Sequence, residues 1–258
     1  YRKMNKTTTR TSNYNRFLGR KTLYLPKHID RKRKSAWLGH IPFSHSFIKK
    51  INPNKFVELG THHGGSYFSF CDSVLKNSLQ TTCYAVDTWE GEEHAGFYEE
   101  DVYQFVDNYN KLNFSHFSNL LQMTFEGAVK KFDDQSVDLI HIDGFHSYEA
   151  VHSDYETWKQ KMAPNGFMLF HDTSVEQPGF GVKRFWNELM NKYPNQCFEF
   201  YHSHGLGVFS LDSGSPISEK LGFTMGRESE YRQRYEKQAV ILGRTMKWLP
   251  KPLWHLIY

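Results

Sequence analysis

Cysteine is scarce in this chain of 258 residues, which has three: Cys71, Cys83 and Cys197. Their odd number and wide spacing match neither a zinc site nor a disulfide framework, so we expect free thiols in a reducing compartment. A run of 18 or more apolar residues is also missing, which excludes a transmembrane helix. The N-terminus lacks the apolar core of a signal peptide, and the start at Tyr1 instead of Met leaves open a missing upstream segment. These absences predict a cytoplasmic protein.

Acidic residues are nearly absent from the start of the chain. Residues 1–40 hold twelve Lys or Arg and one Asp or Glu. Residues 41–214 hold twelve basic and 23 acidic residues, and residues 215–258 hold eight basic and four acidic residues. This charge asymmetry predicts a basic arm (1–35), an acidic central domain (36–214) and a basic, aromatic tail (215–258). The arm is interpreted as a solvated tail, or as a surface for anionic lipid, nucleic acid or a partner protein. The tail could pack on the domain or on a sister subunit, or lie in a membrane interface.

Short apolar runs alternate with longer helical patterns through the central domain. This alternation predicts an α/β fold with a mostly parallel sheet, helices on both faces and a terminal antiparallel hairpin. We expect strands over residues 55–59, 83–86, 120–125, 137–142, 167–170, 198–202 and 205–211, and helices over 66–79, 96–112, 127–132, 147–162, 182–192 and, in the tail, 228–244.

Residues suited to ligand binding recur where the predicted strands end. Gly60, Asp87, Asp143 and Asp172 all lie at strand ends, and ligands of such sheets bind beyond the carboxyl ends of the strands. Gly60 opens a glycine-rich turn that leads into a helix, an arrangement that brings backbone N–H groups close to a ligand. A carboxylate at Asp87 can accept hydrogen bonds from ribose hydroxyls. The sequence therefore indicates a nucleoside-containing ligand.

A second group of polar residues follows the later strands: Asp143 with His146, and His171 with Asp172. Two carboxylates at adjacent strand ends could share a hard divalent cation. Imidazole exchanges a proton near neutral pH, so His146 is the candidate general base. His171 could equally be a packed strand residue, and Lys183 and Arg184 could meet an anionic acceptor or lie on a helix surface.

These motifs together resemble the class I S-adenosylmethionine-dependent methyltransferases. The resemblance covers about residues 35–211 and is closest to a bacterial branch from surface-polysaccharide (lipopolysaccharide, O-antigen or capsule) loci, with similarity to macrocin-type O-methyltransferases and cephalosporin-hydroxylase-like proteins. The matching segments are residues 35–43, 57–61, 86–89, 93–96, 138–144, 146–151 and 170–173. It implies a Rossmann-like fold with a seven-stranded sheet. It also implies S-adenosylmethionine as the cofactor.

The resemblance also implies roles for individual residues. The cofactor-binding set is Glu58, Gly60, Thr61, Gly64, Ser66, Asp87, Thr88, Trp89, Phe125, Glu126 and Asp143. Within it, Glu58, Gly60 and Gly64 would line the methionine end, Asp87 would hold the ribose, and Trp89 would lie near the adenine or simply pack the loop. Asp143 and Asp172 would bind Mg²⁺, as acids at these strand ends do in metal-dependent relatives. Thr173 stands where a third ligand is often an acid or amide, so a metal-free alternative, with His146 oriented by Asp143 or Asp172, stays open.

The predicted activity is O-methyl transfer from S-adenosylmethionine to a sugar hydroxyl of a bacterial surface polysaccharide or its lipid-linked precursor. His146 would be the base, with Asp143 and Asp172 in the catalytic group, and His171, Lys183 and Arg184 would border the acceptor. The alternatives are a metal-dependent small-molecule O-methyltransferase, a cephalosporin-hydroxylase-like enzyme, and a non-catalytic subunit of a glycan-assembly complex. We expect contact of the basic termini with anionic membrane at the inner face of the cytoplasmic membrane, or with glycan-assembly proteins. Nucleic acid is not expected, because the acidic domain would repel it. A homo-oligomer stays open.

Overall fold

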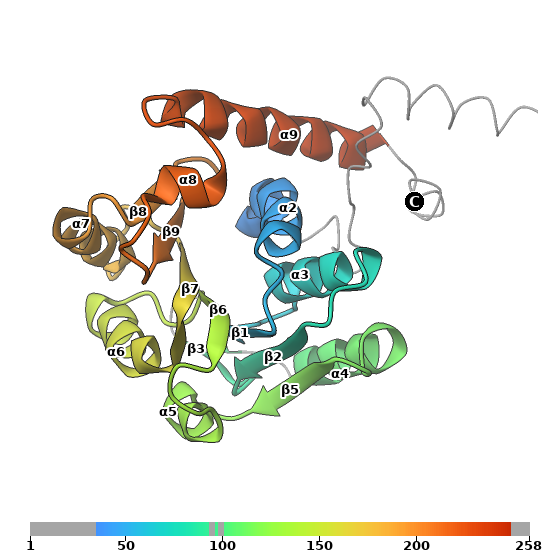
Figure 1. Cartoon of the computed structure of the whole chain (residues 1–258). Helices are drawn as coiled ribbons and strands as arrows, with labels where there is room; N and C mark the ends of the chain where they lie inside the picture. Colours follow the sequence, from blue (N-terminus) through green and yellow to red (C-terminus); the bar gives the residue numbers. More distant parts are fainter. Residues whose placement is uncertain (1–34, 93–95, 98–100, 249–258) are drawn as a thin grey trace, which may run out of the picture.

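The structure is a computed structural model that describes residues 35–92, 96–97 and 101–248. Its centre is a seven-stranded sheet in the order β5-β2-β1-β6-β7-β9-β8 (Figure 1). The first five strands of that order are mutually parallel, and β9 runs antiparallel to both β7 and β8. The bounds are β5 Ser118–Gln122, β2 Thr82–Asp87, β1 Lys55–Leu59, β6 Val137–Ile142, β7 Met162–His171, β9 Leu206–Ser210 and β8 Cys197–Phe200. A separate hairpin pairs β3 (Gly91–Glu92) with β4 (Gly96–Phe97). The predicted fold class is confirmed.

One face of the sheet is covered by elements from both ends of the described chain. These are η1 (Ala36–His40), α2 (Ile41–Ile51), α3 (Gly65–Lys76), α4 (Asp101–Asn113), α8 (Ile217–Leu221) and α9 (Glu228–Trp248). Phe56, Leu139 and Leu169 of the sheet share a continuous apolar core with these helices. Alternate strand residues point to opposite faces, so Glu58 of β1 and His141 of β6 lie on this same side of the sheet.

The other face carries α5 (Phe125–Ala128), η2 (Val129–Lys131), α6 (Tyr148–Trp158), η3 (Lys159–Lys161) and α7 (Val182–Lys192). Its core includes Val57, Ile140, Phe170 and the fully buried Trp158 and Trp186. Side-chain caps begin two of these helices: Ser147 accepts a hydrogen bond from the Ala150 amide, and Thr124 accepts one from the Gly127 amide. The loop that carries His146 therefore ends at Ser147, where α6 begins.

Residues 36–51 form two elements that the sequence pattern does not predict, η1 and α2, and both precede the first strand. Pro42 occupies the first turn of α2, where its missing N–H costs nothing, and Asn52 ends the helix in a left-handed conformation. Strand β5 covers residues 118–122 instead of 120–125, because Thr124 is already the cap of the next helix. Consequently Phe125 and Glu126 begin a helix and do not end a strand.

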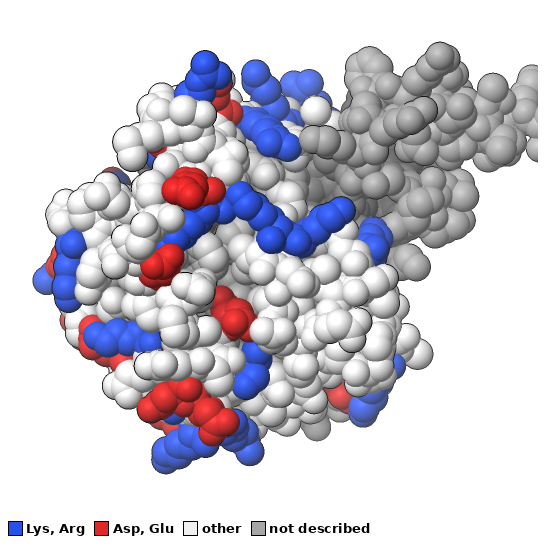
Figure 2. Space-filling model, viewed as in Figure 1, with Lys and Arg blue, Asp and Glu red and all other residues white. Residues whose placement is uncertain are grey.

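The tail is part of the fold as far as the structure describes it. Tyr231, Tyr235 and Leu242 of α9 are buried in the same core as Trp37 and Phe43, which supports the interpretation that the tail packs on the domain. The predicted basic arm, apart from Ser35, and residues 249–258 lie outside the described residues. Figure 2 shows Lys and Arg along α9 and in a band between α8 and α2. Among the described helices, none is long and apolar enough to cross a membrane.

Candidate active site

The glycine-rich loop lies at the carboxyl edge of the sheet, where the loops after β1 and β6 touch. Gly60 has a φ of +87°, and a Cβ atom there would lie 2.1 Å from the carbonyl oxygen of Asp143. Only glycine has neither the strain nor the clash in this position. Gly64, with a φ of +78°, is the residue before α3, so the loop leads directly into the N-terminus of this helix. We call the loop of residues 60–64 the cradle, and its contact with the carboxylate-bearing end of a ligand stays a prediction.

The carboxylate of Asp87 shapes this cradle. One oxygen accepts hydrogen bonds from the Thr61 and His62 amides, both at 2.8 Å, and the other accepts one from the Trp89 amide at 2.7 Å. Each carboxylate oxygen can accept two hydrogen bonds, so the oxygen bound to Trp89 keeps capacity for a ribose hydroxyl. Asp87 thus ties the end of β2 to the glycine-rich loop, and its predicted role toward the ribose stays a prediction.

The two residues that follow Asp87 in the sequence make contacts within the surrounding loops. The Trp89 side chain is buried, donates from its indole N–H to the His62 carbonyl at 2.9 Å, and packs against Tyr103. This geometry agrees with the interpretation that Trp89 packs the loop. The Thr88 hydroxyl accepts from the Glu90 amide, an ordinary turn contact.

Glu58 lies beneath the cradle and has no exposed surface. Its carboxylate is 2.8 Å from Nδ1 of His141, whose side chain is also fully buried. Burial raises the pKa of Glu58, while His141 and Ser66 act in the opposite direction. The buried carboxylate supports the loop from below through His141, and the contact predicted for Glu58 and Ser66 with the methionine end of a cofactor stays a prediction.

Phe125 lies on the side of the site where the resemblance predicts the adenine. It packs against Gly144, where an added Cβ atom would lie 2.5 Å from the Phe125 ring. Glu126 is exposed in the first turn of α5. The structure adds Asp154 of α6 to this region. Its carboxylate would lie 3.7 Å from a Cβ atom on Gly144, and burial with the nearby charge of Glu126 raises its pKa to about 7.

Asp154 predicts a dependence of stability on pH. The unfolded carboxyl loses its proton near its usual pKa of 3.8, whereas the folded one keeps it to about 7, so this group destabilises the fold as pH rises through that window. Asp154→Asn removes the ionisation and should raise the free energy of unfolding at pH 8 by about 1–3 kcal/mol, with little effect at pH 4. Urea unfolding at both pH values measures this. Asp133→Asn, at an exposed carboxyl, is the control, and equal effects of the two variants would contradict the prediction.

The predicted catalytic residues meet beyond β6 and β7. Asp143, His146 and Asp172 each place one oxygen or ring nitrogen within 4.8 Å of the others. Nε2 of His146 is 3.0 Å from a carboxylate oxygen of Asp172. Asp172 has a φ of +61°, a conformation that few non-glycine residues adopt, and it directs this carboxylate toward the loop after β6. We call these three residues the catalytic cage.

Two further histidines contact the cage. Nδ1 of His171 lies 3.2 Å from Asp143 and 3.3 Å from Asp172, and Nδ1 of His204 lies 3.1 Å from the second oxygen of Asp172. Burial opposes ionisation of Asp172, but His146 and His171 hold its pKa below the usual value. Burial also lowers the pKa of His171, but Asp143 and Asp172 raise it well above its usual value. The result is a compact group of paired acids and imidazoles.

The loop between β7 and α7 positions His146. The Phe180 ring stacks on the imidazole, with 4.6 Å between centroids and 22° between planes, and the Gly181 amide donates to the His146 carbonyl at 2.7 Å. Lys183 pairs with Glu176, and Arg184 pairs with Glu188 while its guanidinium covers Tyr148 at 4.1 Å. These pairings agree with a surface role for Arg184, and the acceptor contacts predicted for Lys183 and Arg184 stay predictions.

The sequence analysis missed His204 and the bridging position of His171. His204 follows β8, and it reaches the cage only because β9 pairs with β7 and brings the β8–β9 turn to the end of β7. A histidine in a predicted terminal hairpin gives no signal of that placement. Of the histidines in loops near the glycine-rich segment, His62 and His63 meet edge-on, and His94 lies outside the described residues.

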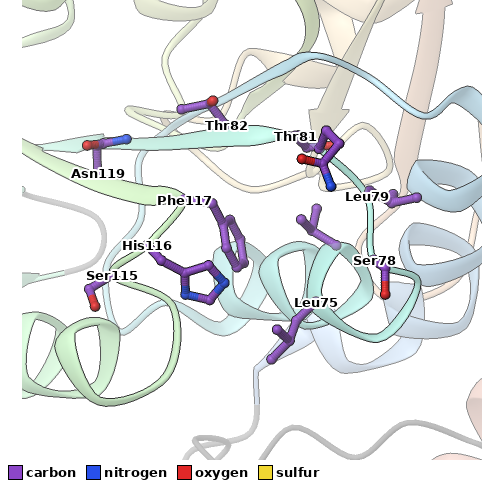
Figure 3. Close-up of a pocket in the computed structure, with 11 residues that line it drawn as sticks. Leu75, Ser78, Leu79, Thr81, Thr82, Ser115, His116, Phe117 and Asn119 are labelled. Atoms are coloured by element: carbon purple, nitrogen blue, oxygen red, sulfur yellow. The ribbon is translucent and has the colours of Figure 1, made fainter.

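A cavity of 480 Å³ lies elsewhere, at the amino ends of β2 and β5. Figure 3 shows Leu75, Leu79, His116 and Phe117 among the side chains around it. Its lining has no carboxylate, and it lies at the edge of the sheet opposite to the catalytic cage. It is therefore separate from the candidate active site.

Comparison with known proteins agrees with this geometry. Residues 57–173, which run from β1 to the residue after Asp172, match a family model described as "Methyltransferase domain". This segment resembles a methyltransferase domain. The match agrees with the predicted enzyme class, S-adenosylmethionine-dependent methyl transfer, and with the predicted methyl donor. The matched segment includes both the cradle and the catalytic cage.

An uncharacterized protein of Sinorhizobium fredii is 46% identical over 187 residues, which is 72% of this chain and 20% of that protein. The chain thus spans about a fifth of the length of this curated relative. Among solved structures, a methyltransferase from Geobacter sulfurreducens has a TM-score of 0.52 at 10% identity, covering 82% of this chain and 92% of that one. An SAH-bound methyltransferase from Podospora anserina has a TM-score of 0.53 at 12% identity, covering 80% and 96%. At such identities these structures show a shared fold.

Proposed function

We propose that this methyltransferase transfers the methyl group to a hydroxyl oxygen, with His146 as the general base. The observation that carries the proposal is the 3.0 Å contact between Nε2 of His146 and Asp172, beside the glycine-rich cradle. A His–carboxylate pair of this kind activates hydroxyl groups in many enzymes. The O-methyltransferase NovP shares the fold, with a TM-score of 0.52 at 14% identity over 69% of this chain and 80% of NovP, which is compatible with the proposal.

S-adenosylmethionine supplies an electrophilic methyl group on a sulfonium, and the cradle formed by Gly60 and Gly64 fits its amino-acid end. Because Nε2 of His146 donates to Asp172, the imidazole would accept the hydroxyl proton at its other ring nitrogen, Nδ1, as the new O–C bond forms and the S–C bond breaks. Asp172 orients the ring and stabilises the imidazolium that results. Phe180 and Gly181 hold the base in place, so that orientation supplies much of the acceleration.

The acceptor in this proposal is a sugar hydroxyl of a bacterial surface polysaccharide or its lipid-linked precursor. It rests on the resemblance of the motifs at residues 35–43 and 138–151 to the surface-glycan branch, since the fold alone does not define a substrate. Contact of the basic arm with anionic membrane, or with glycan-assembly proteins, belongs to the same proposal. A non-catalytic assembly subunit is the rival, but it gives no reason for the cage to retain a base beside the cradle.

The test is transfer of a labelled methyl group from S-adenosylmethionine to candidate acceptors. Nucleotide sugars, lipid-linked glycans and catechols are compared, and the position of the label is read by mass spectrometry. The proposal expects an O-methyl sugar from at least one glycan acceptor. Binding of S-adenosylmethionine in calorimetry with methylation of a catechol alone would reject the sugar. Absence of binding would favour the non-catalytic subunit.

A further inference from the structure

The space between the two carboxylates of the cage holds the His171 ring. One atom, Nδ1, lies 3.2 Å from Asp143 and 3.3 Å from Asp172, so a single N–H is shared by both acids. A divalent ion that bound the oxygens of Asp143 and Asp172 that face His171 would need this same position. The ring therefore competes directly with the metal that the sequence pattern suggests.

The surroundings keep His171 in this place. Its side chain is 6% exposed, and its ring meets Trp37 and His40 edge-on, each with centroids 5.6 Å apart. His40 is fully buried, and its Nε2 is 3.0 Å from the Ser203 carbonyl oxygen, which fixes that ring in turn. Moving His171 aside to admit an ion would therefore disturb a packed set of rings from η1 and the β8–β9 turn.

The remaining donors also fit a hard ion poorly. Both oxygens of Asp172 are already engaged, one by His204 and the other by His146 and His171. Thr173, at the position of the frequent third ligand, is buried beside Glu199 of β8, where its hydroxyl partly offsets the rise that burial causes in the pKa of that carboxyl. Mg²⁺ prefers an octahedron of oxygen atoms. The described residues that could hold such an ion are Asp143, His146 and Asp172, and both carboxylates already contact imidazoles.

We propose that His171 takes the place of a divalent cation in this site, so that methyl transfer is independent of metal. The inference rests on the proposed function and deepens it. His171 acts as a positioning residue: it holds Asp143 and Asp172 together, and through Asp172 it sets the orientation of His146. The N–H of this imidazole, which belongs to the chain itself, lies between the two carboxylates where an ion would otherwise bind.

Manganese binding tests this without reference to activity. Mn²⁺ is titrated into the full chain and followed by electron paramagnetic resonance, for the wild type, His171→Ala and His204→Ala. We expect no bound Mn²⁺ in the wild type, and a newly created site in His171→Ala, where the two carboxylates are released. His204→Ala is the matched control: it removes a ring from Asp172 but leaves the Asp143–His171–Asp172 bridge, and it should bind no Mn²⁺.

Turnover supplies the second measurement. EDTA should leave the wild-type rate unchanged, and His171→Ala should lose about 10²-fold in kcat and regain part of it with Mn²⁺. A purely structural residue would not give metal-dependent rescue. If circular dichroism shows that His171→Ala does not fold, His171→Asn, which keeps one N–H donor, replaces it in both measurements.

Tight Mn²⁺ binding by the wild type, or its weakening in the His171 variant, would overturn the inference, because His171 would then be a bystander or a ligand. The Mn²⁺ titration stays decisive if no acceptor is methylated. Failure of the proposed function, which appears only in the methyl-transfer assay, is therefore distinguishable from failure of the metal inference.

Discussion

Replacing His146 with alanine is expected to lower kcat by about 10²- to 10⁴-fold, the usual contribution of a positioned general base. The affinity for S-adenosylmethionine should stay close to that of the wild type, because the cradle is formed by the loop after β1 and by Asp87. The imidazole lies beyond the end of β6 and touches Asp172 and Phe180. Single-turnover methyl transfer and calorimetry measure the two quantities separately.

His116→Ala is the matched control for this variant. His116 is an exposed histidine in the turn before β5, at the opposite edge of the sheet, and its removal should change neither quantity. His146→Gln, which keeps a polar side chain but cannot take up the proton, should be about as slow as the alanine variant. Wild-type turnover in either His146 variant would reject the assignment of the base.

Gly60→Ala is expected to have the largest effect on the fold. An alanine at a φ of +87° is strained, and its Cβ would lie 2.1 Å from the Asp143 carbonyl oxygen, a backbone atom that cannot rotate away. We expect a loss of about 2–5 kcal/mol in the free energy of unfolding, from strain and overpacking together. The loops after β1 and β6 would separate, so S-adenosylmethionine binding should also be lost. Urea unfolding and calorimetry check both outcomes.

Gly226→Ala separates strain from the clash. Gly226 has a similar φ of +85°, but nothing lies within 4 Å of its added Cβ. Its substitution should cost only about 1 kcal/mol and leave cofactor binding intact. Equal losses in the free energy of unfolding for the two variants would contradict the prediction, because the close contact between Gly60 and Asp143 would then add nothing to the strain.

The sequence predicted the sheet well because most of its strands are buried runs with clear ends. The segments 55–59, 137–142 and 182–192 have the predicted bounds, and each has a strong apolar pattern that the core confirms. Boundaries failed where local chemistry overrides the pattern. Thr124 caps a helix and shortens the strand before it, and η1 and α2 are not among the elements that the sequence predicts.

The sequence alone predicts which residue types lie at the strand ends: the glycines of the cradle, the acid at Asp87, and Asp143 with His146. This prediction needs only the positions of the strands, since the last residues of parallel strands all lie at the carboxyl edge of the sheet. The partners of the Asp143 and Asp172 carboxylates depend instead on contacts between distant segments of the fold. The pairing of β9 with β7 brings His204 to Asp172, and the packing of η1 holds His171 between two carboxylates. The contact of His171 with Asp143 joins residues 28 positions apart, and that of His204 with Asp172 joins residues 32 positions apart, so no local pattern encodes them.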